Sequence, residues 1–179
     1  MSDILKKIIE KKKIEINRLK SRISFEDLES GDDFMTKTVS LSKSIKFSNS
    51  YGIVSEFKRR SPSKININID AKINDIIPGY ISSGVSGISI LTDNKFFGGS
   101  INDLRKAKRL SNLPILRKDF IIDESQIIES KIAGADCILL IIAALSEEKF
   151  RKLMEVSKKL NLDVLVEVHD EAELEIALK

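Results

Sequence analysis

The sequence predicts an α/β fold in which parallel β-strands alternate with amphipathic helices. From Gly52 onward, short apolar runs of strand length alternate with longer segments whose apolar residues recur at helical spacing. Strands that alternate with helices in this way form right-handed βαβ units and a parallel sheet. Two architectures are built from such units, a doubly wound open sheet and a closed (β/α)8 barrel.

An amphipathic helix is expected before this region, over residues 3–20. Its apolar residues recur close to helical spacing, with lysines and glutamates between them; they are Ile4, Leu5, Ile8, Ile9, Ile16 and Leu19. The run Lys11–Lys13 is expected to form the solvated face of this helix. The stretch from about residue 21 to 50 is polar and is expected to be irregular.

Five strands and five helices are expected in the alternating region. The strands are placed at about 52–57, 87–91, 113–117, 136–142 and 163–168, and the helices near 70–83, 101–110, 124–133, 147–160 and 171–179. Three helix starts carry an oxygen-bearing side chain followed three residues later by an acid or an amide, which is a capping pattern; the pairs are Ser100 with Asp103, Asp123 with Gln126, and Asp170 with Glu173. Gly134 follows the third of these helices, where a C-terminal glycine is expected.

Two features favour the barrel over the open sheet. The first strand-to-helix loop has no Gly-x-Gly-x-x-Gly pattern, which counts against a dinucleotide-binding sheet. Charged residues gather at the carboxyl ends of the strands, where barrel enzymes carry their chemistry. Because a closed barrel of this type has eight strands and the last expected helix stops at Lys179 without a capping glycine, we expect an incomplete barrel that holds strands one to five.

Composition sets limits on partners and location. At 179 residues and 42% hydrophobic content the chain can bury the core of one or at most two domains. The net charge of +3 is small beside 30 basic and 27 acidic residues, so no nucleic-acid partner is expected. Neither a signal peptide nor an apolar run near the roughly 20 residues that span a bilayer is present, which predicts no membrane association and a cytoplasmic location.

The single cysteine, Cys137, rules out an intrachain disulfide and a cysteine-cluster metal site. It lies in the apolar run DCILLII and is expected to be a small buried hydrophobe.

The carboxyl ends of three strands carry ionisable side chains. In the first strand Val54, Glu56 and Lys58 are two residues apart and share one face, which in a barrel is the interior. An acid and an amine there are costly to bury unless they pair or contact a substrate. The alternative is a strand that runs into a wet loop, with both charges pointing into solvent.

The third and fifth strands end in the same way. Lys118 shares a face with Leu116 at the end of the third strand, and Glu167 ends the fifth. The alternative role for Lys118 is a salt bridge to Asp119 or to a neighbouring acid. Arg117 is expected to point away from the interior, so that its removal has a mild effect on turnover. Lysines and glutamates that meet in a partly dry barrel mouth can act as acid and base.

The only histidine, His169, follows the fifth strand in a loop and is expected to be a surface or capping residue.

Five segments carry a resemblance to a known family: EFKRRSPSK (56–64), ILTDNKFFGGS (90–100), LPILRKDFIIDESQI (113–127), GADCILLI (134–141) and LVEVHDEAEL (165–174). The match is collinear, and the E-x-K-x-x-S-P-S and L-R-K-D-F motifs together are highly specific. On these motifs the chain resembles indole-3-glycerol phosphate synthase. It departs from the family at Ile65, where many relatives have glycine.

The resemblance implies a TIM barrel with an extra N-terminal helix, so that residues 1–50 form a helix with its extension and residues 51–179 a partial barrel domain. It implies conversion of 1-(2-carboxyphenylamino)-1-deoxyribulose 5-phosphate into indole-3-glycerol phosphate, carbon dioxide and water in tryptophan biosynthesis, without metal or cofactor. The phosphorylated substrate is the expected small-molecule partner, and association with other enzymes of the pathway stays open.

The resemblance also implies residue roles. Lys118 is expected to be the general acid in ring closure and Glu167 the general base in the later dehydration. Glu56 and Lys58 are expected to position the substrate and relay protons. The expected substrate-binding residues are Ser61 for the anion, Phe97 and Phe120 beside the aromatic ring, and Leu139 within the barrel.

Two other interpretations stay open. The family's later strands, with most of its phosphate-binding loops, are not represented, so these 179 residues are expected to be inactive on their own. The chain would then be a non-catalytic truncated barrel, or a half-barrel that needs a partner chain. A different phosphate-binding barrel enzyme is the third interpretation.

Overall fold

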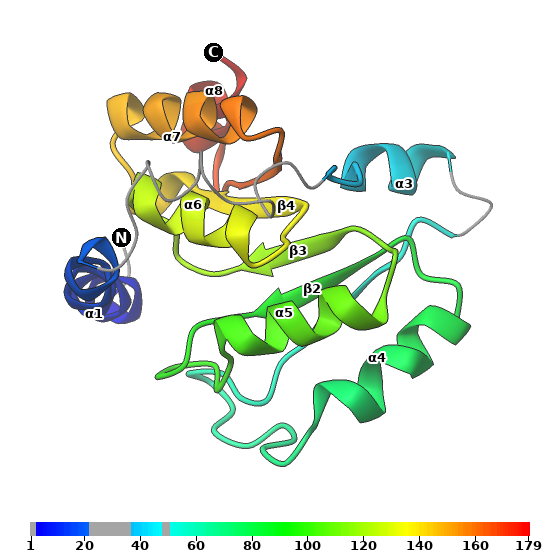
Figure 1. The fold of residues 1–179 in the computed structure, drawn as a ribbon. Helices are drawn as coiled ribbons and strands as arrows, with labels where there is room; N and C mark the ends of the chain where they lie inside the picture. The colour runs from blue at the N-terminus through cyan, green and yellow to red at the C-terminus, as the bar shows by residue number, and fades with distance from the viewer. Residues whose placement is uncertain (1–2, 22–36, 48–50) are drawn as a thin grey trace.

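The computed structural model describes residues 3–21, 37–47 and 51–179. Five parallel strands form one sheet in the order β1-β2-β3-β4-β5, with helices packed against it (Figure 1). The strands are β1 (Val54–Phe57), β2 (Gly87–Leu91), β3 (Ile115–Lys118), β4 (Cys137–Ile141) and β5 (Asp163–Glu167). The helices that follow them are α4 (Ile73–Ser82), α5 (Ile101–Leu110), α6 (Glu124–Ile132), α7 (Glu147–Lys159) and α8 (Glu171–Leu178), with a short 3-10 helix η2 (Ile142–Ala144) after β4. The predicted α/β class with a parallel sheet is confirmed.

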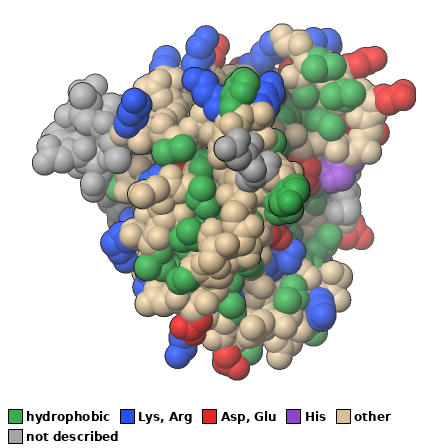
Figure 2. Space-filling model, turned by 90° about the vertical axis from the view of Figure 1, so that its right-hand side faces the viewer, with side chains coloured by type: hydrophobic (Ala, Val, Ile, Leu, Met, Phe, Trp, Pro, Cys, Tyr) green, Lys and Arg blue, Asp and Glu red, His purple; other side chains and the backbone are tan. Residues whose placement is uncertain are grey.

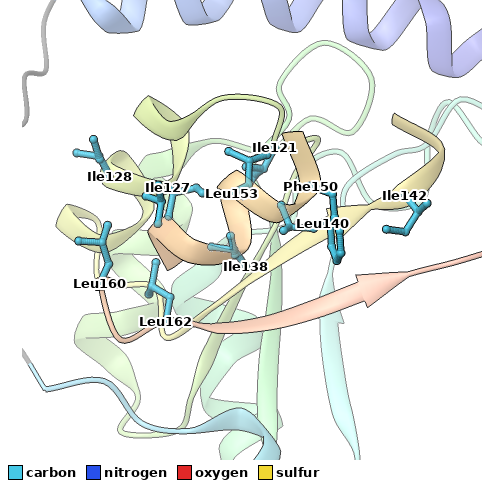
Figure 3. Close-up of a cluster of buried hydrophobic side chains, with 11 residues drawn as sticks. Ile121, Ile127, Ile128, Ile138, Leu140, Ile142, Phe150, Leu153, Leu160 and Leu162 are labelled. Atoms are coloured by element: carbon cyan, nitrogen blue, oxygen red, sulfur yellow. The ribbon is translucent and has the colours of Figure 1, made fainter. Parts of the chain in front are cut away.

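The helix-facing side of the sheet carries the hydrophobic core. Ile88 and Ile90 of β2 pack with Leu104 of α5, and all three side chains are fully buried. On the other half of the sheet, side chains of β4, α6 and α7 converge in a second cluster (Figure 3). This cluster includes Ile138, Leu140, Ile127, Phe150 and Leu153. Because β-strand side chains alternate between faces, the isoleucines and leucines at these positions fix which face meets the helices.

The predicted helix caps are confirmed. The side chains of Ser100, Asp123 and Asp170 accept hydrogen bonds from backbone N–H groups in the first turns of α5, α6 and α8. At α6 the Gln126 side chain completes a reciprocal capping box. Gly134 ends α6 with φ +87°, a left-handed conformation that glycine adopts without steric cost.

Two expectations about local structure were wrong. Residues 41–47 were expected to be irregular but form a short helix, α3 (Leu41–Phe47), which docks through Leu41 on Leu116 and Cys137. The rest of that irregular stretch, residues 22–36 and 48–50, lies outside the described residues. The first and third strands each begin two residues later than predicted, at Val54 and Ile115, and the third includes Lys118 as its last residue.

The helix α1 (Asp3–Lys20) and α3 lie at opposite ends of the strands (Figure 1). α1 lies at the carboxyl ends, to which the strand arrows point, where Ile9 and Ile16 pack on Ile122. α3 lies at the amino ends. There Asp163 accepts hydrogen bonds from the Ser40 hydroxyl at 2.8 Å and the Ser42 amide at 3.1 Å.

Exposed apolar side chains occur near α3. Phe47, Tyr51 and Ile53 are 80%, 94% and 53% exposed. Figure 2 looks at this side of the molecule and shows apolar side chains interspersed with lysines and arginines.

A buried ion cluster attaches α1 to the sheet, and it corrects the expectation for Lys11–Lys13. Lys12 is only 4% exposed rather than solvated. Its ammonium lies 3.0 Å from a carboxylate oxygen of Asp93, 3.0 Å from one of Asp119 and 2.8 Å from one of Glu15. Burial alone would lower the pKa of Lys12, but the carboxylates of Asp119 and Asp93 outweigh it and hold the pKa above its ordinary value.

Arg117 belongs to the same cluster. It points to the helix side of the sheet, as alternation predicts, yet it is 4% exposed and fully paired. Its guanidinium forms ion pairs with Asp119 at 3.2 Å and Glu129 at 2.8 Å, and donates to the Thr92 hydroxyl at 3.1 Å. The expected mild effect of removing Arg117 therefore does not extend to stability, because the buried Asp119 would lose one of its two cationic partners.

Asp119 provides a pH-dependent part of the stability. Burial would raise the pKa of its carboxyl, but Lys12 and Arg117 lower it from 3.8 to about 2. A carboxyl with a lowered folded-state pKa stabilises the fold above its unfolded pKa and loses that contribution as the pH falls through the folded pKa.

We expect the free energy of unfolding to fall by on the order of 2 kcal/mol between about pH 4 and pH 2 because of this one group. Urea titrations at a series of pH values measure the slope. Asp119→Asn should flatten the acid slope, whereas Asp3→Asn, at an exposed site in α1, should leave it unchanged. Equal slopes in the wild type and Asp119→Asn would contradict the assignment.

Arg117→Met should lower the free energy of unfolding by about 3–5 kcal/mol, because it removes a charge partner of the buried Asp119 and of the partly buried Glu129. Chemical denaturation at neutral pH measures the loss. The matched control is Arg109→Met on the exposed side of α5, which should change stability by less than about 0.5 kcal/mol. A loss below about 1 kcal/mol in Arg117→Met would show that the cluster contributes little.

Candidate active site

A cavity of about 220 Å³ opens at the carboxyl ends of the strands, on the face of the sheet that the helices do not cover. Seven of the eight residues predicted from the sequence line it, namely Glu56, Lys58, Phe97, Lys118, Phe120, Leu139 and Glu167. The eighth, Ser61, is not among the lining residues. The structure therefore brings together groups that lie more than 100 residues apart in the sequence.

In-register pairing places these side chains side by side. Glu56 of β1 pairs with Ser89 of β2, and Leu91 of β2 pairs with Lys118 of β3. At the other side Ile141 of β4 pairs with Glu167 of β5. Since paired residues on parallel strands point to the same face, each of these positions lies on the cavity side of the sheet. Sequence reasoning missed three lining residues, Leu91, Asp119 and Ile141, although the same alternation would have found Leu91 and Ile141.

The charged groups in the cavity form a connected set. The Lys58 ammonium donates to Glu56 at 2.7 Å, and the Lys118 ammonium lies 3.6 Å from the second oxygen of Glu56. Lys118 also lies 4.0 Å from a carboxylate oxygen of Glu167. Lys118 thus forms salt bridges with neighbouring acids, Glu56 and Glu167, as one alternative predicted. Its salt bridge to Asp119 is not formed, because Asp119 pairs with Lys12 and Arg117 on the other face.

Solvent reaches these groups only in part. The side chains of Lys58 and Lys118 are each 33% exposed, and that of Glu56 is 28% exposed. Half-buried charges of opposite sign interact more strongly than they would in bulk water and can still contact a small molecule. The Ser89 hydroxyl adds a hydrogen bond to Glu56 at 3.4 Å.

An apolar wall stands beside the charges. The rings of Phe97 and Phe120 lie with their centroids 6.0 Å apart and their planes tilted by 37°. Leu91, Leu139 and Ile141 complete the wall. A planar aromatic ligand fits such a surface, since aromatic rings pack with tilted or offset neighbours.

Ser61 lies in the loop after β1 and makes a local turn. Its amide donates to the Lys64 carbonyl at 2.8 Å, and its hydroxyl lies 3.1 Å from the Ser63 hydroxyl. The structure shows no contact between Ser61 and the charged groups of the cavity.

His169 lies at the rim, with its side chain 56% exposed. One ring nitrogen lies 3.4 Å from Glu167 and the other 3.2 Å from Glu173. Its backbone amide donates to Glu173 at 2.8 Å, so the residue takes part in the start of α8.

Within the described ranges no group of three or more His, Cys, Asp or Glu side chains is arranged to hold a metal ion. In the same part of the chain no helix is long and apolar enough to cross a membrane. Cys137 is buried at the bottom of the inner face, and burial raises the pKa of its thiol to about 12.

Comparisons with known proteins show one family. The family model of indole-3-glycerol phosphate synthase matches residues 5–179. The chain is similar to the indole-3-glycerol phosphate synthase of Bacteroides thetaiotaomicron, with 48% identity over 97% of this chain and 66% of the relative. Enzymes of the same name from Bacillus mycoides and Prochlorococcus marinus are 43% and 44% identical over 100% and 96% of this chain, and over 67% and 59% of their own length. The chain thus spans about two thirds or less of the length of these relatives.

The loop that carries Phe97 depends on a close backbone approach at Gly99. A side chain at this position would overlap the backbone carbonyl of Leu91, which cannot move without breaking the pairing of β2. We expect Gly99→Ala to lower the free energy of unfolding by about 1–3 kcal/mol or more. Thermal melting measures the change.

The matched control is Gly79→Ala in α4, where an added side chain meets nothing within 4 Å. This variant should be more stable by about 0.5–1 kcal/mol, since alanine favours a helix over glycine. Equal stability of the two variants would show that the close approach at Gly99 does not constrain the loop.

Proposed function

Because the chain belongs to the indole-3-glycerol phosphate synthase family, we propose that its cavity serves the decarboxylative ring closure of 1-(2-carboxyphenylamino)-1-deoxyribulose 5-phosphate to indole-3-glycerol phosphate. The observation that carries the proposal is the position of Lys118. Its ammonium lies between the carboxylates of Glu56 and Glu167, next to an aromatic wall. This arrangement offers a proton donor, a proton acceptor and a surface for an aromatic ring.

Lys118 is the general acid of ring closure. In this step an aromatic carbon attacks the substrate carbonyl carbon, and negative charge develops on the carbonyl oxygen. An ammonium held out of bulk water stabilises that charge and delivers a proton to it. The ring then loses carbon dioxide and regains its aromatic character.

Glu167 is the general base of the later dehydration. Elimination of water removes a proton from the substrate, and the carboxylate of Glu167 lies across the cavity mouth from Lys118 at 4.0 Å. Glu56 and Lys58, paired at 2.7 Å, position the substrate and pass protons between its oxygens and solvent.

The apolar wall binds the anthranilate ring through Phe97, Phe120 and Leu139. Ser61 contributes to anion binding from the first loop. To do so its hydroxyl exchanges the contact with Ser63, 3.1 Å away, for a phosphate oxygen.

We propose further that the sheet corresponds to the first five units of a (β/α)8 barrel and that turnover needs the remaining units. The sequential parallel order of the strands supports this, since neighbouring strands of a barrel follow one another in the sequence. Leu165, on the cavity side of β5, is 44% exposed, as expected for an inner face with a neighbour still to be added.

The direct test compares residues 1–179 alone with the same residues fused to the carboxyl-terminal third of the Bacteroides relative. Indole fluorescence follows product formation. We expect turnover in the fusion and none in residues 1–179. Full activity of residues 1–179 would contradict the need for further strands, and no activity in a folded fusion would contradict the proposed function.

In the fusion, Lys118→Ala should lower kcat by about 10²–10⁴-fold and change KM much less, because general acid catalysis acts on the transition state. Steady-state kinetics measure both. Lys46→Ala, on α3 at the opposite end of the strands, is the control and should be unaffected. Near-normal turnover in Lys118→Ala would remove this residue from the mechanism.

Glu167→Gln should slow dehydration more than ring closure. In a single turnover we expect carbon dioxide to appear before the indole product, with a lag that the wild type lacks. Trapped labelled carbon dioxide and indole fluorescence report the two steps separately. Simultaneous release at the wild-type rate would exclude Glu167 as the base.

A further inference from the structure

Lys12 connects α1 to two loops that border the cavity. Two of its three carboxylate partners come from the segments that follow β2 and β3, namely Asp93 and Asp119. Both partners are almost fully buried, at 0% and 3% exposure. Among the described residues Oδ2 of Asp93 accepts no hydrogen bond, so the Lys12 ammonium at 3.0 Å is its charge partner.

Asp119 transmits the position of Lys12 to the cavity. It is the residue between Lys118 and Phe120, and the oxygen that faces Lys12 also accepts the Phe120 amide at 2.8 Å. The other oxygen accepts the Thr92 hydroxyl at 2.6 Å. The turn that aims Lys118 into the cavity is therefore held from its outer side.

Asp93 acts in the same way on the neighbouring loop. Its second carboxylate oxygen accepts the Phe96 amide at 2.7 Å, and its carbonyl accepts the Gly99 amide at 2.8 Å. These bonds shape the loop that presents Phe97. One ammonium thus contacts the carboxylates that organise both halves of the aromatic wall.

The ion pairs of Lys12 with Asp93 and Asp119 border a cavity and act in addition to apolar packing of α1. A second cavity of about 310 Å³, distinct from the one that holds Lys118, lies beside the cluster and is lined by Lys12, Thr92, Arg117 and Asp119 among others. The apolar contact of α1 in this region comes from Leu5, Ile9 and Ile16, which pack in one cluster with Ile122, Phe120, Ala144 and Leu145. Removal of the ammonium therefore leaves room for the two loops to move.

We propose that Lys12 is a positioning residue for the reaction, which sets the places of Lys118 and Phe120 through Asp119 and the place of Phe97 through Asp93. This inference rests on the proposed function for its kinetic consequence. Its structural part, the tie between α1 and the two loops, stands independently of the reaction.

The first measurement is amide hydrogen exchange on residues 1–179, which needs no activity. Lys12→Met removes the charge and keeps an apolar chain of similar length. We expect exchange in residues 118–123 and 93–99 to rise by about tenfold or more, while β4 and β5 change by less than about twofold. Lys13→Met, on the exposed side of α1, is the matched control and should leave every segment unchanged.

A second variant guards against failure to fold, since Lys12→Met leaves Asp93 buried without a charge partner. Lys12→Met combined with Asp93→Asn removes one charge of each sign and keeps the Lys118 turn without its tie to α1. Exchange at residues 118–123 should rise in this variant too. Wild-type exchange there, or an equal rise throughout the sheet, would overturn the proposal.

The kinetic measurement uses the fusion of residues 1–179 with the carboxyl-terminal third of the Bacteroides relative, for which turnover is expected. Lys12→Met should lower kcat by about tenfold or more, because small misplacements of a catalytic group are costly, and should change KM by less than about threefold. In an Asp119→Asn background the same substitution should cost less than about threefold, since groups that act through one another are not additive. A raised KM with unchanged kcat would overturn the positioning role. So would fully additive effects of Lys12→Met and Asp119→Asn on kcat. A folded fusion without substitutions that shows no turnover would instead refute the proposed function and leave the exchange result to decide the tie.

Discussion

The register of the parallel strands is the constraint on which the rest of the structure depends. Side chains of consecutive residues point to opposite faces, and paired strands keep this alternation in step. The consequence is sharpest at Arg117 and Lys118. The first lies buried under α6 with two carboxylates, and the second lies in the cavity 3.6 Å from Glu56. A shift of β3 by one residue would exchange an immobilised guanidinium for a reactive ammonium.

The two faces of β3 therefore carry two charge systems with different properties. On the helix side Lys12, Arg117 and Asp119 are almost fully buried and have several partners each. On the cavity side Lys118 has only distant partners, at 3.6 and 4.0 Å, and remains a third exposed. The helix-side charges, which have all their partners within the protein, hold the backbone in place. The cavity-side ammonium of Lys118 can still bind a substrate. Asp119 belongs to both, because it also borders the cavity.

Periodicity and capping chemistry predicted the α/β class, the five strands and most helix starts, because these depend on local sequence. The seven lining residues followed from strand ends and from the family motifs. The buried role of Lys12 did not, since a run of three lysines is typical of a solvated helix face and its partners, Asp93 and Asp119, are distant in the sequence. The helix α3 was missed because its stability comes from Leu41 docking on Leu116 and Cys137, which only the tertiary structure shows.

The order of the strands in the sheet is also their order in the sequence, so each strand can pair with its predecessor while the chain is being synthesised. The segment before β1 does not follow this scheme. Thr38 donates to the carbonyl of Asn161, and Ser40 to Asp163, each across 123 residues. These bonds can form only after β5 has emerged from the ribosome. Residues 38–40 can therefore complete their attachment only at the end of synthesis of the five-stranded sheet, whereas Val39 and Leu41 already find Asp136 and Leu116 in earlier segments.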